Sequence, residues 1–152
     1  MLSDKEIVRK AEKQDLSAIL TLYEYLHPDE KQPEISAGLA AKWNFLCDNE
    51  FFHYFVVECE NAIVSTCSIS IIPNLTRNGR SFGLIENVVT SKYHRRKGFA
   101  KSVIGAALDF AWEHGCYKVI LETDNYRDLD QFYENIGFQK GPKTAWIIRK
   151  AT

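Results

Sequence analysis

The stretch that decides the fold is Arg95-Arg96-Lys97-Gly98-Phe99-Ala100, a short basic segment that contains one glycine. A β-branched run, Leu84–Thr90, precedes it and is typical of a strand. After the segment, apolar residues recur at the spacing of an amphipathic helix: Ala100, Val103, Ile104, Ala107, Leu108 and Ala111. The sequence therefore predicts a strand, a basic loop and a long helix in immediate succession.

Such a loop is suited to binding an anion. The first backbone N–H groups of a helix have no partner within the helix, and the helix dipole places partial positive charge there. Gly98 lets a ligand approach the backbone, and four side chains add full charges: Arg95, Arg96, Lys97 and Lys101. We expect a phosphate or pyrophosphate site. The glycine spacings of Walker and dinucleotide-binding loops are missing, and a solvated basic surface is the alternative interpretation.

Two motifs resemble the markers of one enzyme superfamily. Arg95-x-x-Gly98-x-Ala100 resembles the Arg/Gln-x-x-Gly-x-Gly/Ala signature of the GCN5-related N-acetyltransferases (the GNAT superfamily). Downstream, Phe132-Tyr133-Glu134-Asn135-Ile136-Gly137-Phe138 is similar to the second marker, Phe-Tyr-x-x-x-Gly-Phe, at a separation typical of the family. The resemblance covers residues 7–148. The segment 115–121 also resembles the glucosamine-6-phosphate N-acetyltransferase branch at the same place.

Periodicity predicts one domain, residues 1–152, of the α/β (mixed α+β) class. Strands are expected at 6–10, 53–59, 62–72, 84–90, 117–122 and 144–149. Four helices are expected: one capped by Asp15 that ends near His27-Pro28, one over 39–47, one from the basic loop to Gly115, and one between Asp128 and Gly137. A tight turn is expected at Glu60-Asn61. The order matches the GNAT fold, which the resemblance implies to be a mixed central β-sheet of 6–7 strands flanked by helices on both faces.

The resemblance also implies a co-substrate, acetyl-CoA. Its pyrophosphate is expected on the backbone amides of the loop, with one lysine nearby: Arg96, Lys97, Gly98, Phe99, Ala100 and Lys101. The preceding strand is expected to carry a bulge and to pair with the pantetheine arm through Val88 and Val89, as an added strand would. Asn125 is carried over as a coenzyme A contact, although the family position falls on Tyr126.

Two residues are carried over as catalytic. Tyr133 matches the family tyrosine that protonates the leaving thiolate, and a phenol is protonated at neutral pH. It also lies on an apolar helical stripe, so a core residue is the alternative. Glu86 is the candidate base that deprotonates the amine, because many family members place a carboxylate on this strand; a structural carboxylate is the alternative. The resemblance implies direct transfer, with the Val88 amide holding the oxyanion.

Composition narrows the class of partner. The chain has 19 basic and 20 acidic residues and a net charge of −1, which argues against nucleic acid or anionic membrane as the chief partner. No apolar run approaches the ~20 residues of a membrane span. The N-terminus, with Asp4 and Glu6, lacks a signal-peptide pattern, so we expect a cytoplasmic protein. The four cysteines are widely spaced, and no metal site is expected.

The acceptor is expected to be a small-molecule amine. The first two helices and the loops 28–35 and 74–82 are expected to select it; Arg77 and Arg80 are either ligands for an acceptor phosphate or carboxylate, or solvated loop residues. Two alternatives stay open: a protein or peptide N-acetyltransferase, and a non-catalytic acetyl-CoA sensor. Because the family often dimerises, the resemblance also implies a homodimer.

Overall fold

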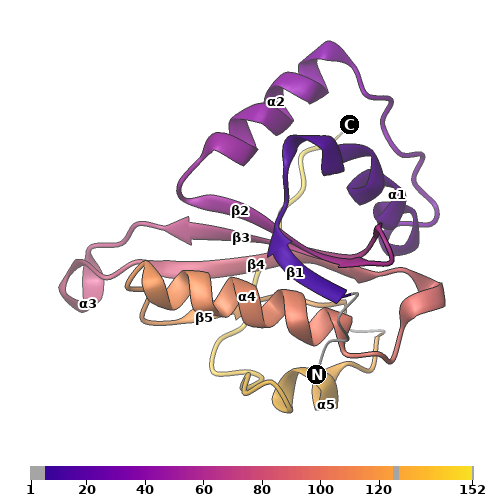
Figure 1. The fold of residues 1–152 in the computed structure, drawn as a ribbon. Coiled ribbons are helices and arrows are strands. Elements are labelled where there is room, and N and C mark those ends of the chain that lie inside the picture. The colour runs from indigo at the N-terminus through magenta and orange to yellow at the C-terminus, as the bar shows by residue number, and fades with distance from the viewer. Residues whose placement is uncertain (1–5, 125–126, 152) are drawn as a thin grey trace. The chain divides into compact units, whose positions relative to one another are not determined.

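The computed structural model describes residues 6–124 and 127–151, which fall into two compact units, Met1–Glu122 and Thr123–Thr152. The first unit is built on a sheet whose strands lie side by side in chain order (Figure 1). These strands are β1 (Glu6–Lys10), β2 (Phe52–Cys59), β3 (Ala62–Ile72), β4 (Phe82–Thr90) and β5 (Val119–Leu121). Neighbouring strands are antiparallel, except that β4 and β5 are parallel. The sheet is therefore mixed, as expected.

Helices cover both faces of this sheet (Figure 1). The helices of the first unit are η1 (Lys13–Asp15), α1 (Leu16–Leu26), α2 (Ala37–Asp48), α3 (Thr76–Gly79), η2 (Lys92–His94) and α4 (Phe99–Glu113). Val56 of β2 packs in one cluster with Ile19 of α1 and Trp43 of α2. Its neighbour Phe55 contacts Phe110 of α4, with ring centroids 6.0 Å apart. Successive side chains of a strand alternate between faces, so α1 and α2 lie opposite α4.

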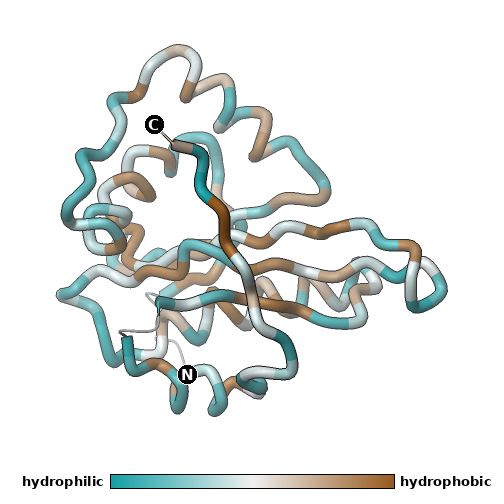
Figure 2. The backbone as a smooth tube through the Cα atoms, turned by 180° about the vertical axis from the view of Figure 1, so that it is seen from behind, coloured by the Kyte–Doolittle hydropathy of each residue, from teal (hydrophilic) through white to brown (hydrophobic). Residues whose placement is uncertain are grey.

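The core lies between these layers. Its fully buried side chains include Ile69 and Ile85 on the strands, and Val103, Ile104 and Ala107 on α4. Figure 2 shows hydrophobic residues concentrated along the strands and α4, with hydrophilic residues over the loops. Among the described residues, no helix combines the length and the apolar character needed to cross a membrane.

Two turns show how the sequence directs the chain. Glu60 and Asn61 have φ values of 51° and 64° between β2 and β3. Two consecutive left-handed residues are the requirement of the favoured two-residue hairpin turn, so the tight turn expected there is confirmed. Thr76–Gly79 is a tight turn at the tip of the β3–β4 hairpin, and Arg77 and Asn78 are left-handed rather than helical. The helix periodicity of the sequence gives no signal for α3 for that reason.

The strand count differs from the expectation of 6–7. The described residues contain five strands, and none of these lies in the second unit. Residues 144–149 carry a β-branched and aromatic pattern but have no strand pairing. A strand is defined by backbone hydrogen bonds to a neighbour, and side-chain pattern supplies only a propensity for it. The second unit contains one short helix, α5 (Asp130–Glu134), where a helix near 129–136 was expected.

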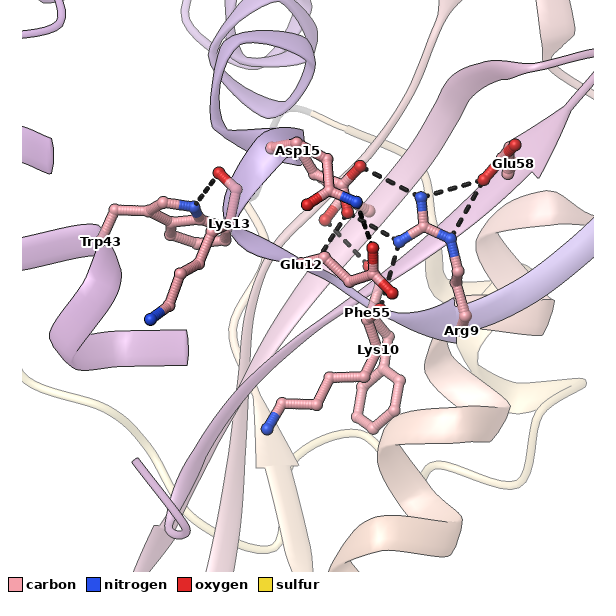
Figure 3. A network of polar contacts seen from close by, with 10 residues as sticks. Arg9, Lys10, Glu12, Lys13, Asp15, Trp43, Phe55 and Glu58 are labelled. Carbon is pink, nitrogen blue, oxygen red and sulfur yellow. Dashed lines mark hydrogen bonds and ion pairs between the residues drawn. The ribbon is translucent and has the colours of Figure 1, made fainter. Parts of the chain in front are cut away.

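A paired charge network fastens β1 to its surroundings (Figure 3). The Arg9 guanidinium donates to Asp15 at 2.7 and 3.0 Å and to Glu58 at 2.9 and 3.0 Å. The Glu12 amide also donates to Asp15, at 2.7 Å. Burial raises the pKa of Asp15, but the hydrogen bonds from Arg9 and Glu12 outweigh it and hold that pKa below its ordinary value. Asp15 is buried, and its negative charge is paired with the guanidinium of Arg9.

Candidate active site

The loop before α4 presents its backbone to solvent. Gly98 is the N-cap of α4 with φ of 86°, and no side chain caps the helix. A Cβ at Gly98 would meet nothing within 4 Å. Arg96 is also left-handed, with φ of 64°. Where right-handed and left-handed residues alternate, successive backbone N–H groups point into one concavity that can bind an anion. The amides that begin α4 are therefore available to a ligand.

Phe99 fixes the position of these amides. Its side chain is 1% exposed and anchors the first turn of α4 in the core, next to His94 at a ring separation of 6.4 Å. Ser102 closes the turn by donating its amide to the Gly98 carbonyl at 3.0 Å. The loop is consequently held by one buried ring while its polar groups stay outside.

The basic loop carries positive charge that forms no ion pair within the described residues. Four cationic side chains are exposed: Arg95, Arg96, Lys97 and Lys101. The ion pairs in the described part of the chain involve other residues. Together with the helix dipole, these cations make the start of α4 the place where an anionic ligand gains most.

The strand that leads into this loop is bulged. The register of β3 against β4 shifts between Thr66 and Ser68. Two residues of β4, Asn87 and Val88, therefore oppose a single residue of β3. Asn87 has φ of 54°, a left-handed conformation that Asn tolerates better than other side chains. The bulge expected on this strand is confirmed, and it leaves ladder groups unpaired.

Serine hydroxyls of β3 stabilise both sides of the bulge. Ser68 donates to the Glu86 carbonyl at 3.2 Å, and Ser65 donates to the Val89 carbonyl at 3.2 Å. Both serines are buried, at 3% and 0% exposure. This role of the two serines does not follow from the sequence pattern. The available signal was their position as small hydroxyl residues inside an otherwise apolar strand.

One edge of β4 is open beyond the bulge. β5 pairs with Gly83, Leu84 and Ile85 only. From residue 86 to residue 90, no described strand lies on that side of β4. An extended ligand can pair with this backbone as an added strand would. The open edge leads directly into the basic loop, so Val88 and Val89 lie along the same path as Gly98.

Glu86 lies at the start of the open edge. It is exposed, whereas the neighbouring Ile85 is fully buried against the opposite face. Glu86 shares a cross-strand row with Ser68 and Tyr54, on the face covered by α1 and α2. Adjacent strands are about 4.8 Å apart, so the Cα atoms of Tyr54 and Glu86 are about 10 Å apart. Burial raises the pKa of Tyr54, and the charge of Glu86 adds to this shift, so the phenol stays protonated.

The second motif forms the end of α5 in the second unit. The half-buried ring of Tyr133 packs edge-on against Phe132 and Phe138, with centroids 5.0 and 6.0 Å away. The Tyr133 carbonyl accepts hydrogen bonds from the amides of Ile136 and Phe138, both at 3.1 Å. Gly137, with φ of 110°, permits this turn.

Some sequence-based candidates fall outside this description. Asn125 and Tyr126 lie outside the described residues. Tyr133 belongs to the second unit, and only its contacts within that unit are described. The residues that the structure brings together in the first unit are Glu86, Val88, Val89, Arg96, Lys97, Gly98, Phe99, Ala100 and Lys101.

The described residues hold two buried free thiols. In these ranges, no three His, Cys, Asp or Glu side chains are grouped to hold a metal ion. The two thiols are those of Cys67 and Cys116. Burial raises the pKa of the Cys67 thiol, which keeps it protonated and unreactive.

Arg77 and Arg80 lie far from the loop. Arg77 lies within the hairpin tip and Arg80 directly follows it, just before the first residue of β4, whereas Gly98 comes after the last residue of β4. A Cβ at Gly83 would lie 3.5 Å from the Ala111 side chain, so the last turns of α4 pack at the hairpin end. The 15 residues of α4 span about 22 Å. The basic loop and these arginines therefore lie near opposite ends of α4.

A bulged strand, an open strand edge and an uncapped basic helix start thus follow one another in the first unit. The model of the acetyltransferase (GNAT) family matches residues 15–138. The chain belongs to this family.

Three similar proteins place the chain more closely. Over 77 residues it is 40% identical to a glucosamine 6-phosphate N-acetyltransferase of Trypanosoma brucei brucei, covering 51% of each chain. A putative acetyltransferase from Agrobacterium tumefaciens has a TM-score of 0.87 and 32% identity, covering 95% of this chain and 99% of that one. An acetyltransferase from Clostridium acetobutylicum solved with acetyl-CoA has a TM-score of 0.74, covering 94% and 96%; at 23% identity it shows a shared fold alone. The chain spans about half the length of the curated relatives it matches.

Proposed function

We propose that this chain is an acetyl-CoA-dependent N-acetyltransferase that moves the acetyl group directly to a primary amine on a small molecule. One observation carries the proposal: the uncapped, uncompensated start of α4 continues the open, bulged edge of β4 within a single unit. Family membership supports it. The names of the relatives make an amino sugar phosphate, glucosamine 6-phosphate, the first acceptor to test.

The residues of the loop bind the co-substrate. Amides from Arg96 to Ala100 donate to its pyrophosphate, and Lys97 and Lys101 neutralise the charge. The free backbone groups of Val88 and Val89 pair with the pantetheine arm. This orientation directs the thioester toward the bulge, next to Glu86.

Glu86 prepares the nucleophile. An alkylamine is a cation at pH 7, and Glu86 accepts its proton directly or through one water. The neutral nitrogen then attacks the thioester carbonyl carbon while the Val88 amide donates to the developing oxyanion. As the C–S bond breaks and sulfur takes the electron pair, Tyr133 donates its phenolic proton to that sulfur. The acetamide and the free thiol are the products.

The test is acetyl-CoA-dependent release of free thiol against a panel of amines. The panel holds amino sugars and their phosphates, polyamines, amino acids, aminoglycosides and short peptides. Release with one small-molecule class supports the proposal and identifies the acceptor. Release with peptides alone indicates a protein acetyltransferase. Acetyl-CoA binding without release in any arm indicates a sensor and contradicts the proposed reaction.

Glu86→Gln tests the base with a nearly isosteric side chain. We expect kcat/KM to fall about 100-fold at pH 7 and to recover partly at high pH, where the free amine is already neutral. An unchanged pH profile would leave Glu86 as a structural carboxylate.

Tyr133→Phe tests the acid. We expect kcat to fall about tenfold or more, while the affinity for acetyl-CoA stays within about twofold. Full activity in this variant would make Tyr133 a packing residue between Phe132 and Phe138.

A further inference from the structure

A second set of cations converges on one aromatic ring, at the hairpin end of the sheet. The Arg77 and Arg80 guanidinium carbons lie 5.9 and 5.6 Å from the Tyr117 ring centroid. The Lys118 ammonium lies 5.4 Å from the same centroid and 5.1 Å from that of Phe82. These residues come from two segments about 40 positions apart in the chain. We call Arg77, Arg80, Tyr117 and Lys118 the Tyr117 cluster.

Within the described residues, the three cations of the Tyr117 cluster make no ion pair. Since each lies within 6 Å of one centroid, any two of them are at most about 12 Å apart. The ion pairs of the described residues are all made elsewhere. Arg77 and Arg80 are exposed and Lys118 is half-buried. Like charges at this separation repel one another, and a bound anion relieves that repulsion.

The loop holds its arginines in a strained but fixed arrangement. Arg77 and Asn78 have φ values of 56° and 61°, which non-glycine residues rarely adopt. The Asn74 side chain fixes the start of the loop by accepting from the Leu75 amide at 3.0 Å. The Arg80 Nε donates to the Arg77 carbonyl at 3.2 Å. The turn backbone and the Arg80 Nε are thus held by hydrogen bonds within the turn.

The Tyr117 cluster is separate from the basic loop at the start of α4. It lies at the end of α4 that contacts Gly83, about 20 Å along the helix from Gly98. Figure 1 shows α3 at the tip of the β3–β4 hairpin, away from the start of α4. A phosphate or pyrophosphate bound at the Gly98 loop therefore does not touch the Tyr117 cluster.

We propose that the Tyr117 cluster binds a phosphate group that is distinct from the pyrophosphate of acetyl-CoA. A single carboxylate brings one negative charge to three cations, whereas a phosphate monoester brings about 1.5 to 2 and three acceptor oxygens. The two arginine forks match phosphate oxygens in geometry, and Lys118 adds a third donor. This inference does not depend on the proposed function.

The test is a titration of the full chain followed by backbone amide resonances. The probes are inorganic pyrophosphate, a phosphoserine peptide and the same peptide without phosphate. We expect shifts at residues 77–80 and 117–118, and at least tenfold weaker binding there in the Arg77→Gln/Arg80→Gln variant. The matched control, Lys31→Gln/Lys42→Gln, removes the same charge from exposed sites and is expected to bind as the unaltered chain does.

Each arm has a defined meaning. Stronger binding of the phosphopeptide than of pyrophosphate assigns the phosphate to a protein, and the reverse order assigns it to a small molecule. Lys118→Gln lies outside the strained loop and is also expected to weaken binding; this result excludes loop unfolding as the cause. Shifts confined to residues 96–101 would overturn the proposal, as would equal binding by the double variant. Residues 96–101 report on the acetyl-CoA loop, and residues 77–80 and 117–118 report on the Tyr117 cluster. The titration therefore shows which of the two proposed sites does not bind.

Discussion

Two charge clusters in the first unit differ in whether their charges are paired. Around Arg9, one guanidinium meets two carboxylates, and all the groups are part-buried (Figure 3). At the start of α4, four cations are exposed and meet no carboxylate within the described ranges. The first arrangement satisfies itself and stabilises the fold. The second has positive charges without carboxylate partners among the described residues, and this unpaired charge is what indicates an anion-binding site.

The largest expected effect comes from placing a negative charge in the unpaired cluster. Gly98→Glu puts a carboxylate beside the amides that hold the pyrophosphate, so we expect acetyl-CoA affinity to fall about 1,000-fold by calorimetric titration. Gly98→Gln is the matched control, since it has the same shape and the same cost at φ of 86° without the charge. If both variants bind alike, the loss is steric or conformational and the electrostatic argument is wrong.

Breaking the paired cluster is expected to reduce stability without touching binding. Arg9→Met leaves the buried carboxylate of Asp15 without its cation, so we expect the free energy of unfolding in urea to fall by about 3 kcal/mol. Lys13→Met is the control, because the exposed pair between Lys13 and Asp48 contributes less than about 1 kcal/mol. A loss of acetyl-CoA affinity in the natively folded Arg9 variant would show that the two clusters are coupled.

The two clusters also differ in how far the sequence predicts them. The basic loop is local: six consecutive residues, a strand before and a helix after, and the structure confirms that order. The partners of Arg9 lie 6 and 49 residues away, and only the register of β1 against β2 brings Glu58 close. The family resemblance implies a bulge on this strand, but its position at Asn87 follows only from the pairing of β4 with β3. Long-range register is what local pattern does not determine.

Stability is also expected to depend on pH through His53, a third kind of charge site. Burial, then the charge of Lys10, lowers the pKa of this imidazole from 6.5 to about 4; its ring stacks on Phe110 at 4.0 Å. The unfolded chain therefore binds the proton more readily, and stability falls as pH drops from about 6.5 to about 4. Because the ring is partly exposed, we expect a loss of about 2 kcal/mol. In the His53→Leu variant, the free energy of unfolding from chemical denaturation should not show this fall between pH 6.5 and 4. An equal dependence of that free energy on pH in both proteins would contradict the prediction.

The smallest expected effect is the response to salt. Mobile ions screen the exposed cations of the loop, so raising salt from about 0.05 to 0.5 M should weaken acetyl-CoA binding by about tenfold or less. The part-buried Arg9 network should change little over the same range, as read from urea midpoints. Equal sensitivity of binding and of stability would remove the distinction between the clusters.

The most direct test of the central claim is an amide-resonance titration of the whole chain with acetyl-CoA. The account predicts saturable shifts at residues 96–101 and along the open edge of β4 from 86 to 90. It predicts no comparable shifts at Arg9 and Asp15. Saturable binding whose shifts avoid the start of α4, or no binding at all, would contradict the claim that unpaired charge marks the site.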